Sequence, residues 1–187
     1  MNINNIISFH PIISMKWHSK HKIYHKINKY MPKEWQFIIM NNGSLTQNLN
    51  SLLINHTTIE MSQKHNSIFN KQIFTNIRIV WLENYIDQNL TFAKSIWIMN
   101  KKDNTYTQVL KTAPIGYSLI TFEIDIYKNL EEIYCGYSYH LEDIFQTSKL
   151  IWGRKYKINY SNNSYVTIEE YFTPKLIEFF QTSKKYH

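Results

Sequence analysis

Residues 151–174, with the sequence IWGRKYKINYSNNSYVTIEEYFTP, decide the fold of this chain. Two alternating runs flank a polar linker at residues 161–164, which is the pattern of a β-hairpin with a four-residue loop. Successive side chains of a strand point to opposite faces of a sheet. Glu170 therefore shares an apolar face with Val166, Ile168 and Phe172. A carboxylate on such a face is costly to desolvate, so Glu170 needs a partner, a raised pKa or a ligand.

The composition predicts one globular domain. Of the 187 residues, 43% are hydrophobic and 16% aromatic, and the mean hydropathy is -0.41. Such a chain is long enough for one sizeable core. No apolar run approaches the roughly 20 residues that a membrane-spanning helix needs, so we expect no stable membrane insertion.

Most of the net charge of +7 lies near the N-terminus, because residues 1–40 carry six Lys and a single Glu. The rest of the chain is nearly balanced, and we therefore expect no nucleic-acid partner. Four histidines (His10, His18, His21 and His25) have a spacing that fits one helical face, but no acidic or Cys ligand lies near them. A solvated basic helix or arm is favoured over a metal site. We predict a basic N-terminal arm over residues 1–30 and a single domain over residues 31–187.

The lone Cys135 excludes an intrachain disulfide and a Cys-based zinc site, and its neighbours favour a buried structural thiol. The remaining periodicity predicts an α+β fold with a single, largely antiparallel sheet and flanking helices. Expected helices lie near residues 32–40, 45–54, 108–112 and 114–122. Expected strands are 77–82, 91–99, 130–140 and the two hairpin strands. Residues 55–76 are ambiguous, with a strand or loop and then a short helical piece, and residues 141–150 form a helix or loop.

Two cations also interrupt apolar strand patterns. Arg78 lies among Val80 and Leu82, and Lys94 shares a face with Phe92, Ile96 and Ile98. Either side chain alone could extend its charge to the rim of the sheet. Together with Glu170, they predict a polar pocket inside a sheet-based core, suited to a small organic anion that carries a hydroxyl. The chain has no glycine-rich phosphate loop, GxSxG or HExxH motif, so neither a nucleotide cofactor nor a catalytic metal has support.

Three stretches resemble the chorismate pyruvate-lyase family, including its members encoded in algal plastid genomes. They are GSLT at 43–46, KTAPIGYSLI at 111–120, and IWGRKYKI followed by VTIEEYFTP in the C-terminal hairpin. The resemblance covers residues 31–174. It implies helical flaps over an internal pocket and the cofactor-free conversion of chorismate to 4-hydroxybenzoate and pyruvate, for quinone biosynthesis. Together with the bias toward Asn, Ile, Lys and Tyr, it implies a location in the plastid stroma.

The resemblance also implies roles for particular residues. Arg78 would pair with the ring carboxylate, and the backbone N–H groups of Leu45 and Ile115 would bind the same group from the two flaps. Glu170 would accept a hydrogen bond from the ring hydroxyl and assist proton removal. Lys94 would hold the departing enolpyruvyl carboxylate if it takes the place of a second pocket arginine.

The Trp-Gly-Arg motif at 152–154 is interpreted as structural. Trp152 would pack at the strand entry, Gly153 would permit a turn, and Arg154 would bridge backbone or acidic groups. Three functions stay open: a lyase, a non-catalytic module of the same fold that binds small aromatic acids, and an interaction protein that docks its basic arm on an acidic membrane or partner. For the first two, the partner is a small aromatic or cyclohexadienyl carboxylate, and we expect a monomer.

Overall fold

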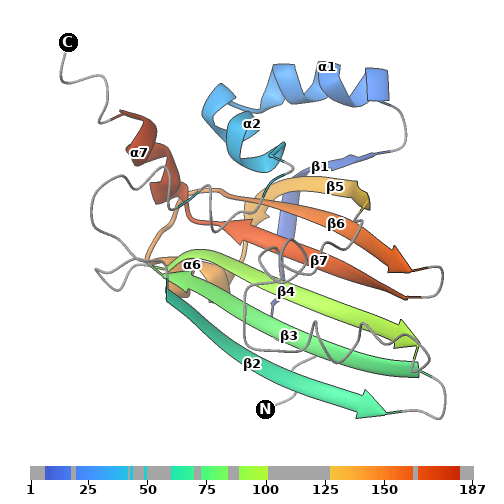
Figure 1. Ribbon diagram of the computed structural model, residues 1–187. Helices are drawn as coiled ribbons and strands as arrows, with labels where there is room; N and C mark the ends of the chain where they lie inside the picture. The colour runs from blue at the N-terminus through green and yellow to red at the C-terminus, as the bar shows by residue number, and fades with distance from the viewer. Residues whose placement is uncertain are drawn as a thin grey trace.

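The computed structural model describes residues 7–17, 20–41, 43, 49, 60–69, 73–83, 89–100, 127–161 and 164–181. Within these residues seven strands form one sheet, in the order β1-β5-β6-β7-β4-β3-β2 (Figure 1). The strands are β1 (His10–Lys16), β2 (Glu60–Phe69), β3 (Ile73–Glu83), β4 (Asn89–Asn100), β5 (Tyr127–Tyr137), β6 (Ile151–Ser161) and β7 (Ser164–Phe172). The helical elements are α1 (Lys20–Tyr30), α2 (Lys33–Ile39), α6 (Tyr139–Phe145), the 3-10 turn η2 (Pro174–Ile177) and α7 (Glu178–Gln181).

All neighbouring strands in this sheet are antiparallel, which confirms the predicted α+β class. The C-terminal hairpin forms the middle of the sheet, where β6 pairs with β5 and β7 pairs with β4. Its strands extend further than predicted, because Ser161 and Ser164 already face each other as a cross-strand pair. The hairpin thus joins the N-terminal and central strands into one sheet.

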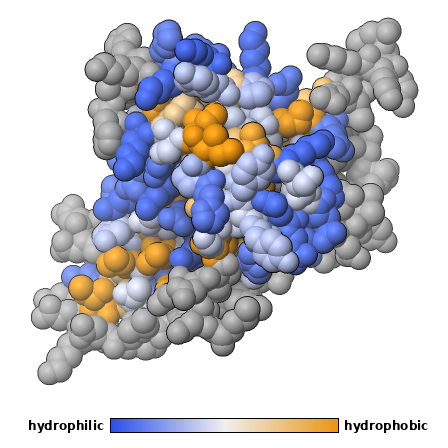
Figure 2. Space-filling view, turned by 180° about the vertical axis from the view of Figure 1, so that it is seen from behind, coloured by the Kyte–Doolittle hydropathy of each residue, from blue (hydrophilic) through white to orange (hydrophobic). Residues whose placement is uncertain are grey.

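The two faces of the sheet are covered by different helices. The inner face carries Ile133, Trp152 and Phe172, which form one core cluster with residues of α1, α2 and η2 such as Ile27, Trp35 and Leu176. The outer face carries Ile79, Phe92, Tyr134 and Tyr171, which pack with Leu141 and Phe145 of α6. Seen from behind, the molecule shows separate hydrophobic patches among hydrophilic residues (Figure 2).

Part of the N-terminal segment belongs to the sheet and the core. Residues 10–16 form the edge strand β1, paired with β5, and Ile23 and Ile27 of the predicted helix are buried. The strand was not expected from the sequence. Because β1 lies at the edge and most of its residues are exposed, its alternation is weak. The boundary between an arm and a domain at residue 30 stays a prediction.

Other sequence-based expectations have mixed outcomes. The helix near 32–40 is confirmed as α2, and the strands near 77–82, 91–99 and 130–140 are confirmed as β3, β4 and β5. Residues 73–76 belong to β3, so a helical piece there is wrong. Apart from Leu49, the expected helices at 45–54, 108–112 and 114–122 lie outside the described residues.

The described residues lack two kinds of feature. They contain no group of three or more His, Cys, Asp or Glu side chains that could hold a metal ion. Within the same residues, no helix is long and apolar enough to cross a membrane. Cys135 is a free, buried thiol, and burial raises its pKa to about 11.

Candidate functional site

The strand register brings Arg78 and Glu170 to the inner face of the sheet. Arg78 on β3 lies opposite Ser95 on β4, which lies opposite Ile168 on β7. Glu170 follows Ile168 by two residues and therefore points to the same face. Both side chains are buried, with Arg78 3% and Glu170 5% exposed. A cation and a carboxylate thus lie on one face, with β4 between their strands.

Glu170 has two partners on β6. Arg154 donates from Nε to Oε2 of Glu170 at 2.6 Å, and the hydroxyl of Tyr156 donates to Oε1 at 2.7 Å. Burial alone would raise the pKa of Glu170, but Arg154, followed by Lys128 and the Tyr156 hydrogen bond, lowers it below its usual value. Of the three possibilities for a carboxylate on an apolar strand face, the structure therefore shows the first, a partner. Glu170 is an ionised hydrogen-bond acceptor.

Arg154 also holds the end of α2. Its Nη1 donates to the carbonyls of Ile39 at 2.7 Å and Asn41 at 2.9 Å, with a longer contact to Ile38. The last carbonyls of a helix have no partner within the helix, and the negative end of the helix dipole favours a cation. Burial lowers the pKa of Arg154, but Glu170 raises it more, so the net shift is upward. These contacts match the bridging role predicted for Arg154.

The predictions for the other two residues of the Trp-Gly-Arg motif, Trp152 and Gly153, have different outcomes. Trp152 packs beside Trp35 with ring centroids 6.3 Å apart, in agreement with its predicted packing role. Gly153 does not lie at a turn but within β6, so that part of the prediction is wrong. A Cβ atom there would overlap the ring of Tyr134 and lie 2.7 Å from the carbonyl oxygen of Glu170. The glycine is needed because an aromatic ring covers the strand.

Lys94 does not join Arg78 and Glu170. It lies opposite Ile79 and Glu169, so its side chain belongs to the outer face, whereas its neighbour Ala93 lies opposite Glu170 on the inner face. The cause is a register shift at the end of β3, between Leu82 and Glu83. Without that shift, Lys94 would lie opposite Arg78. Leu45 and Ile115, the predicted backbone donors, lie outside the described residues.

Lys128 on β5 is a site residue that the sequence did not reveal. It lies opposite Ile158 on the inner face, just before the alternating run that the sequence marks as a strand. Its Nζ donates to the carbonyl of Asn41 at 3.3 Å and lies 4.1 Å from the ring centroid of Tyr156. Burial and then Arg154 lower the pKa of Lys128 to about 8, while Glu170 acts in the opposite direction. Lys128 is therefore mostly protonated at neutral pH.

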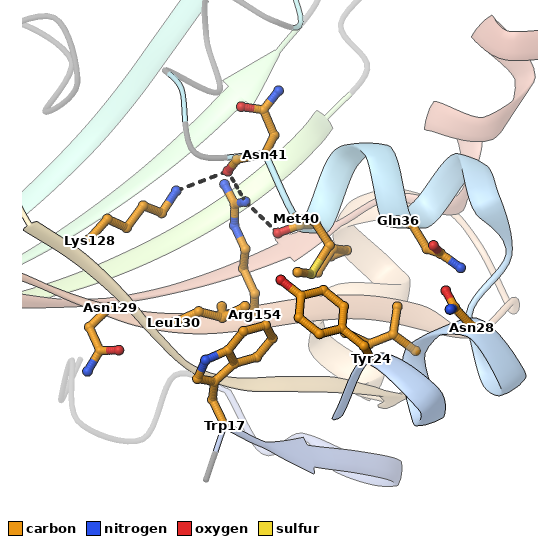
Figure 3. A pocket seen from close by; sticks show the side chains of 12 residues that line it. Trp17, Tyr24, Asn28, Gln36, Met40, Asn41, Lys128, Asn129, Leu130 and Arg154 are labelled. Carbon is orange, nitrogen blue, oxygen red and sulfur yellow. Dashed lines mark hydrogen bonds between the residues drawn. The ribbon is translucent and has the colours of Figure 1, made fainter. Parts of the chain in front are cut away.

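A cavity of about 520 Å³ opens beside Arg154, between α1, α2 and β5 (Figure 3). Figure 3 shows the Lys128 and Arg154 side chains converging on Asn41, with Trp17 and Tyr24 nearby. Asn28, Gln36, Asn41 and Asn129 also line the cavity. The described residues that line the cavity include no carboxylate, so it suits an anion.

The chain has a single antiparallel sheet with helices on both faces, and a buried arginine and an ion-paired glutamate lie on the inner face. This arrangement places it among the chorismate lyase-like α+β proteins. The model of the chorismate pyruvate-lyase Rv2949c-like family matches residues 39–180, and the chain belongs to this family. The family predicted from the motifs is therefore confirmed.

The chain is also similar to proteins named uncharacterized protein ycf21. That of Antithamnion sp. is 48% identical over 180 residues, covering 96% of this chain and 98% of the relative. That of Porphyra purpurea is 32% identical over 172 residues, covering 88% and 95%. That of Pyropia yezoensis is 30% identical over 159 residues, covering 82% and 88%. These relatives are plastid-encoded in algae.

Proposed function

We propose that this protein eliminates pyruvate from chorismate to give 4-hydroxybenzoate, in the plastid stroma and for quinone biosynthesis. The observation that carries the proposal is the burial of Arg78 and Glu170 on one face of the sheet, one strand apart. Membership of the chorismate pyruvate-lyase Rv2949c-like family supports the reaction class. The plastid-encoded relatives support the location.

The spacing of the two charged residues suits the substrate. Strands lie about 4.8 Å apart, so β3 and β7, with β4 between them, are separated by about 10 Å. Chorismate carries its ring carboxylate and its hydroxyl at opposite ends of a six-membered ring. Arg78 would pair with the carboxylate through a charge-assisted contact. Burial lowers the pKa of Arg78 only to about 10, so it keeps its charge at neutral pH.

The reaction balances without an added oxidant or cofactor. The ring carbon that bears the hydroxyl loses its proton, and the electron pair completes the aromatic ring. The neighbouring C–O bond to the enolpyruvyl group breaks, and the released enolpyruvate takes up a proton at its methylene carbon to become pyruvate. The atoms of chorismate thus equal those of the two products.

Glu170 is better suited to hold the hydroxyl than to remove the proton. Its pKa is lowered, chiefly by Arg154, and a weakly basic carboxylate is a poor acceptor for a proton bound to carbon. Orientation of chorismate and exclusion of water would then supply much of the rate.

The same observation supports a second candidate, a module that binds aromatic acids without turning them over. Both oxygens of Glu170 already accept hydrogen bonds from Arg154 and Tyr156, which leaves little basicity for catalysis. Binding of 4-hydroxybenzoate needs only the Arg78 cation and one further lone pair on Glu170. Turnover separates the two candidates.

The test is a chorismate assay on purified protein without added metal or nucleotide, with 4-hydroxybenzoate followed by chromatography. We expect product from the wild type and from the outer-face control Lys94→Gln, and loss of product in Glu170→Gln, which keeps the side-chain size. Thermal stabilisation by 4-hydroxybenzoate without turnover would establish the binding module instead. If the protein shows no turnover and 4-hydroxybenzoate does not stabilise it, both candidates are overturned.

A further inference from the structure

Three cations project from described strands onto the inner face: Arg78, Arg154 and Lys128. The proposed function assigns Arg78 to the ring carboxylate. Arg154 is engaged by Glu170 and by the carbonyls at the end of α2. Lys128 contacts the neutral carbonyl of Asn41 and the ring of Tyr156, and no carboxylate of the described residues lies within hydrogen-bond distance of its Nζ.

Chorismate carries a second carboxylate, on the enolpyruvyl group that departs. This group is attached to the ring carbon next to the hydroxyl-bearing carbon, so it lies near the residue that holds the hydroxyl. Lys128 is in that neighbourhood, because its Nζ lies 4.1 Å from the ring centroid of Tyr156 and the Tyr156 hydroxyl donates to Glu170 at 2.7 Å. A cation there would offset the repulsion between Glu170 and the second carboxylate.

The cavity beside Arg154 provides room for the departing group. Its volume of about 520 Å³ exceeds what a three-carbon acid requires, and Lys128 and Arg154 both line it. The charge of Arg154 is balanced by Glu170 at 2.6 Å, whereas Lys128 forms no salt bridge with any residue that the structure describes. Asn28 also lines the cavity, and its side-chain amide carries a further donor for a carboxylate or a carbonyl.

One wall of this cavity lies outside the family match. Tyr24, Ile27 and Asn28 come from α1, whereas the family model begins at residue 39. The Antithamnion relative covers 96% of the chain and therefore includes most of this segment. Part of the cavity wall therefore comes from a segment that the family model does not cover.

We propose that Lys128 binds the enolpyruvyl carboxylate of the substrate and that the adjoining cavity receives the pyruvate half. Lys128 is then a specificity residue, because it distinguishes chorismate from acids that lack the second carboxylate. The inference rests on the proposed function. It assigns to Lys128 the task that the family resemblance implied for Lys94, whose side chain is on the other face.

The test compares Lys128→Met with the matched outer-face variant Lys94→Met. We expect Lys128→Met to raise the KM for chorismate by about ten- to a hundredfold, the effect of losing one charged hydrogen bond. The Kd of 4-hydroxybenzoate, which lacks the enolpyruvyl group, should change less than about threefold on the same scale. Inhibition by added pyruvate should weaken in Lys128→Met, and Lys128→Arg should recover much of the chorismate affinity. Lys94→Met should leave the KM for chorismate, the Kd of 4-hydroxybenzoate and the inhibition by pyruvate unchanged.

Two results would overturn the assignment. Equal weakening of chorismate and 4-hydroxybenzoate binding would mean that Lys128 only supports Asn41 and Tyr156. An unchanged KM for chorismate would exclude contact with the substrate. The proposed function is judged on the wild type alone, by turnover and 4-hydroxybenzoate binding. If turnover and 4-hydroxybenzoate binding are both absent, stabilisation of the wild type by pyruvate that is lost in Lys128→Met would still establish the cavity as a site for 2-oxo acids. No stabilisation by pyruvate would overturn the assignment of the cavity as well.

Discussion

Arg154 and Glu170 form a buried ion pair, with 2.6 Å between Nε and Oε2 and only 1% and 5% of the two residues exposed. The pair joins two tasks, because Arg154 fixes the end of α2 while Glu170 faces the proposed ligand. Removing one member of such a pair leaves the other charge desolvated and uncompensated. The stability of the fold and the geometry of the site therefore depend on the same contact.

Arg154→Met should lower the free energy of unfolding by about 3–5 kcal/mol, the usual effect of breaking a buried pair on one side. The matched control is Lys155→Met on the same strand, which breaks the partly exposed pair with Glu169 at 3.5 Å. That control should change stability by less than about 1 kcal/mol. Urea denaturation measures both, and equal losses would contradict a special role for the buried pair.

The stability contributed by Glu170 should depend on pH in the acid range. Its pKa in the folded protein lies below the ordinary value of 4.5, so its contribution is fully present above 4.5 and is lost as the pH falls through the folded pKa. The free energy of unfolding of the wild type should therefore fall more steeply below pH 4.5 than that of Glu170→Gln. Denaturation curves at several acid pH values test this, and parallel curves would show that other groups dominate.

Gly153→Ala should destabilise the protein by about 1–3 kcal/mol through overpacking. The added methyl group would overlap the Tyr134 ring and approach the Glu170 carbonyl oxygen to 2.7 Å. Thermal denaturation provides the measurement, with the exposed surface change Ser148→Ala as the control. A melting temperature equal to that of the control would mean that the ring moves aside freely.

Arg78→Lys should weaken 4-hydroxybenzoate binding by about 1–3 kcal/mol, because an ammonium cannot make the bidentate contact of a guanidinium. Calorimetric titration at neutral pH gives the affinity, where the Arg78 pKa of about 10 keeps the wild-type side chain charged. Lys94→Gln, on the outer face, should bind like the wild type. Unchanged affinity in Arg78→Lys would remove Arg78 from the site.

The alternation in residues 151–174 predicts the hairpin and the buried position of Glu170, since both follow from local pattern. The partner of Glu170 does not follow from it. Continued regularly from the Ser161–Ser164 pair, the hairpin would put Lys155 opposite Glu170, but an irregularity between Asn159 and Ser161 brings Arg154 there. A one-residue slip exchanges the two faces of a strand, so a single bulge decides which cation the carboxylate meets.

The same effect explains the misplacement of Lys94. Its face depends on the bulge near Leu82 and not on the alternation within its own strand. Lys128 was missed for a different reason. It becomes part of the site only through Asn41 and Tyr156, which are far from it in the sequence. Pairwise contacts of this kind leave no local pattern.

The contacts of Arg154 with Ile39 and Asn41 join positions 115 and 113 residues apart in the chain. During synthesis, β1 and β2 to β4 leave the ribosome before the hairpin that joins them into one sheet. Until β6 and β7 arrive, β5 and β4 present open strand edges to other chains. Folding that waits for such distant partners is slow, and the nascent chain is exposed to aggregation in the meantime. The arrangement that buries the site at the centre of the sheet thus makes its assembly a late event in the life of each molecule.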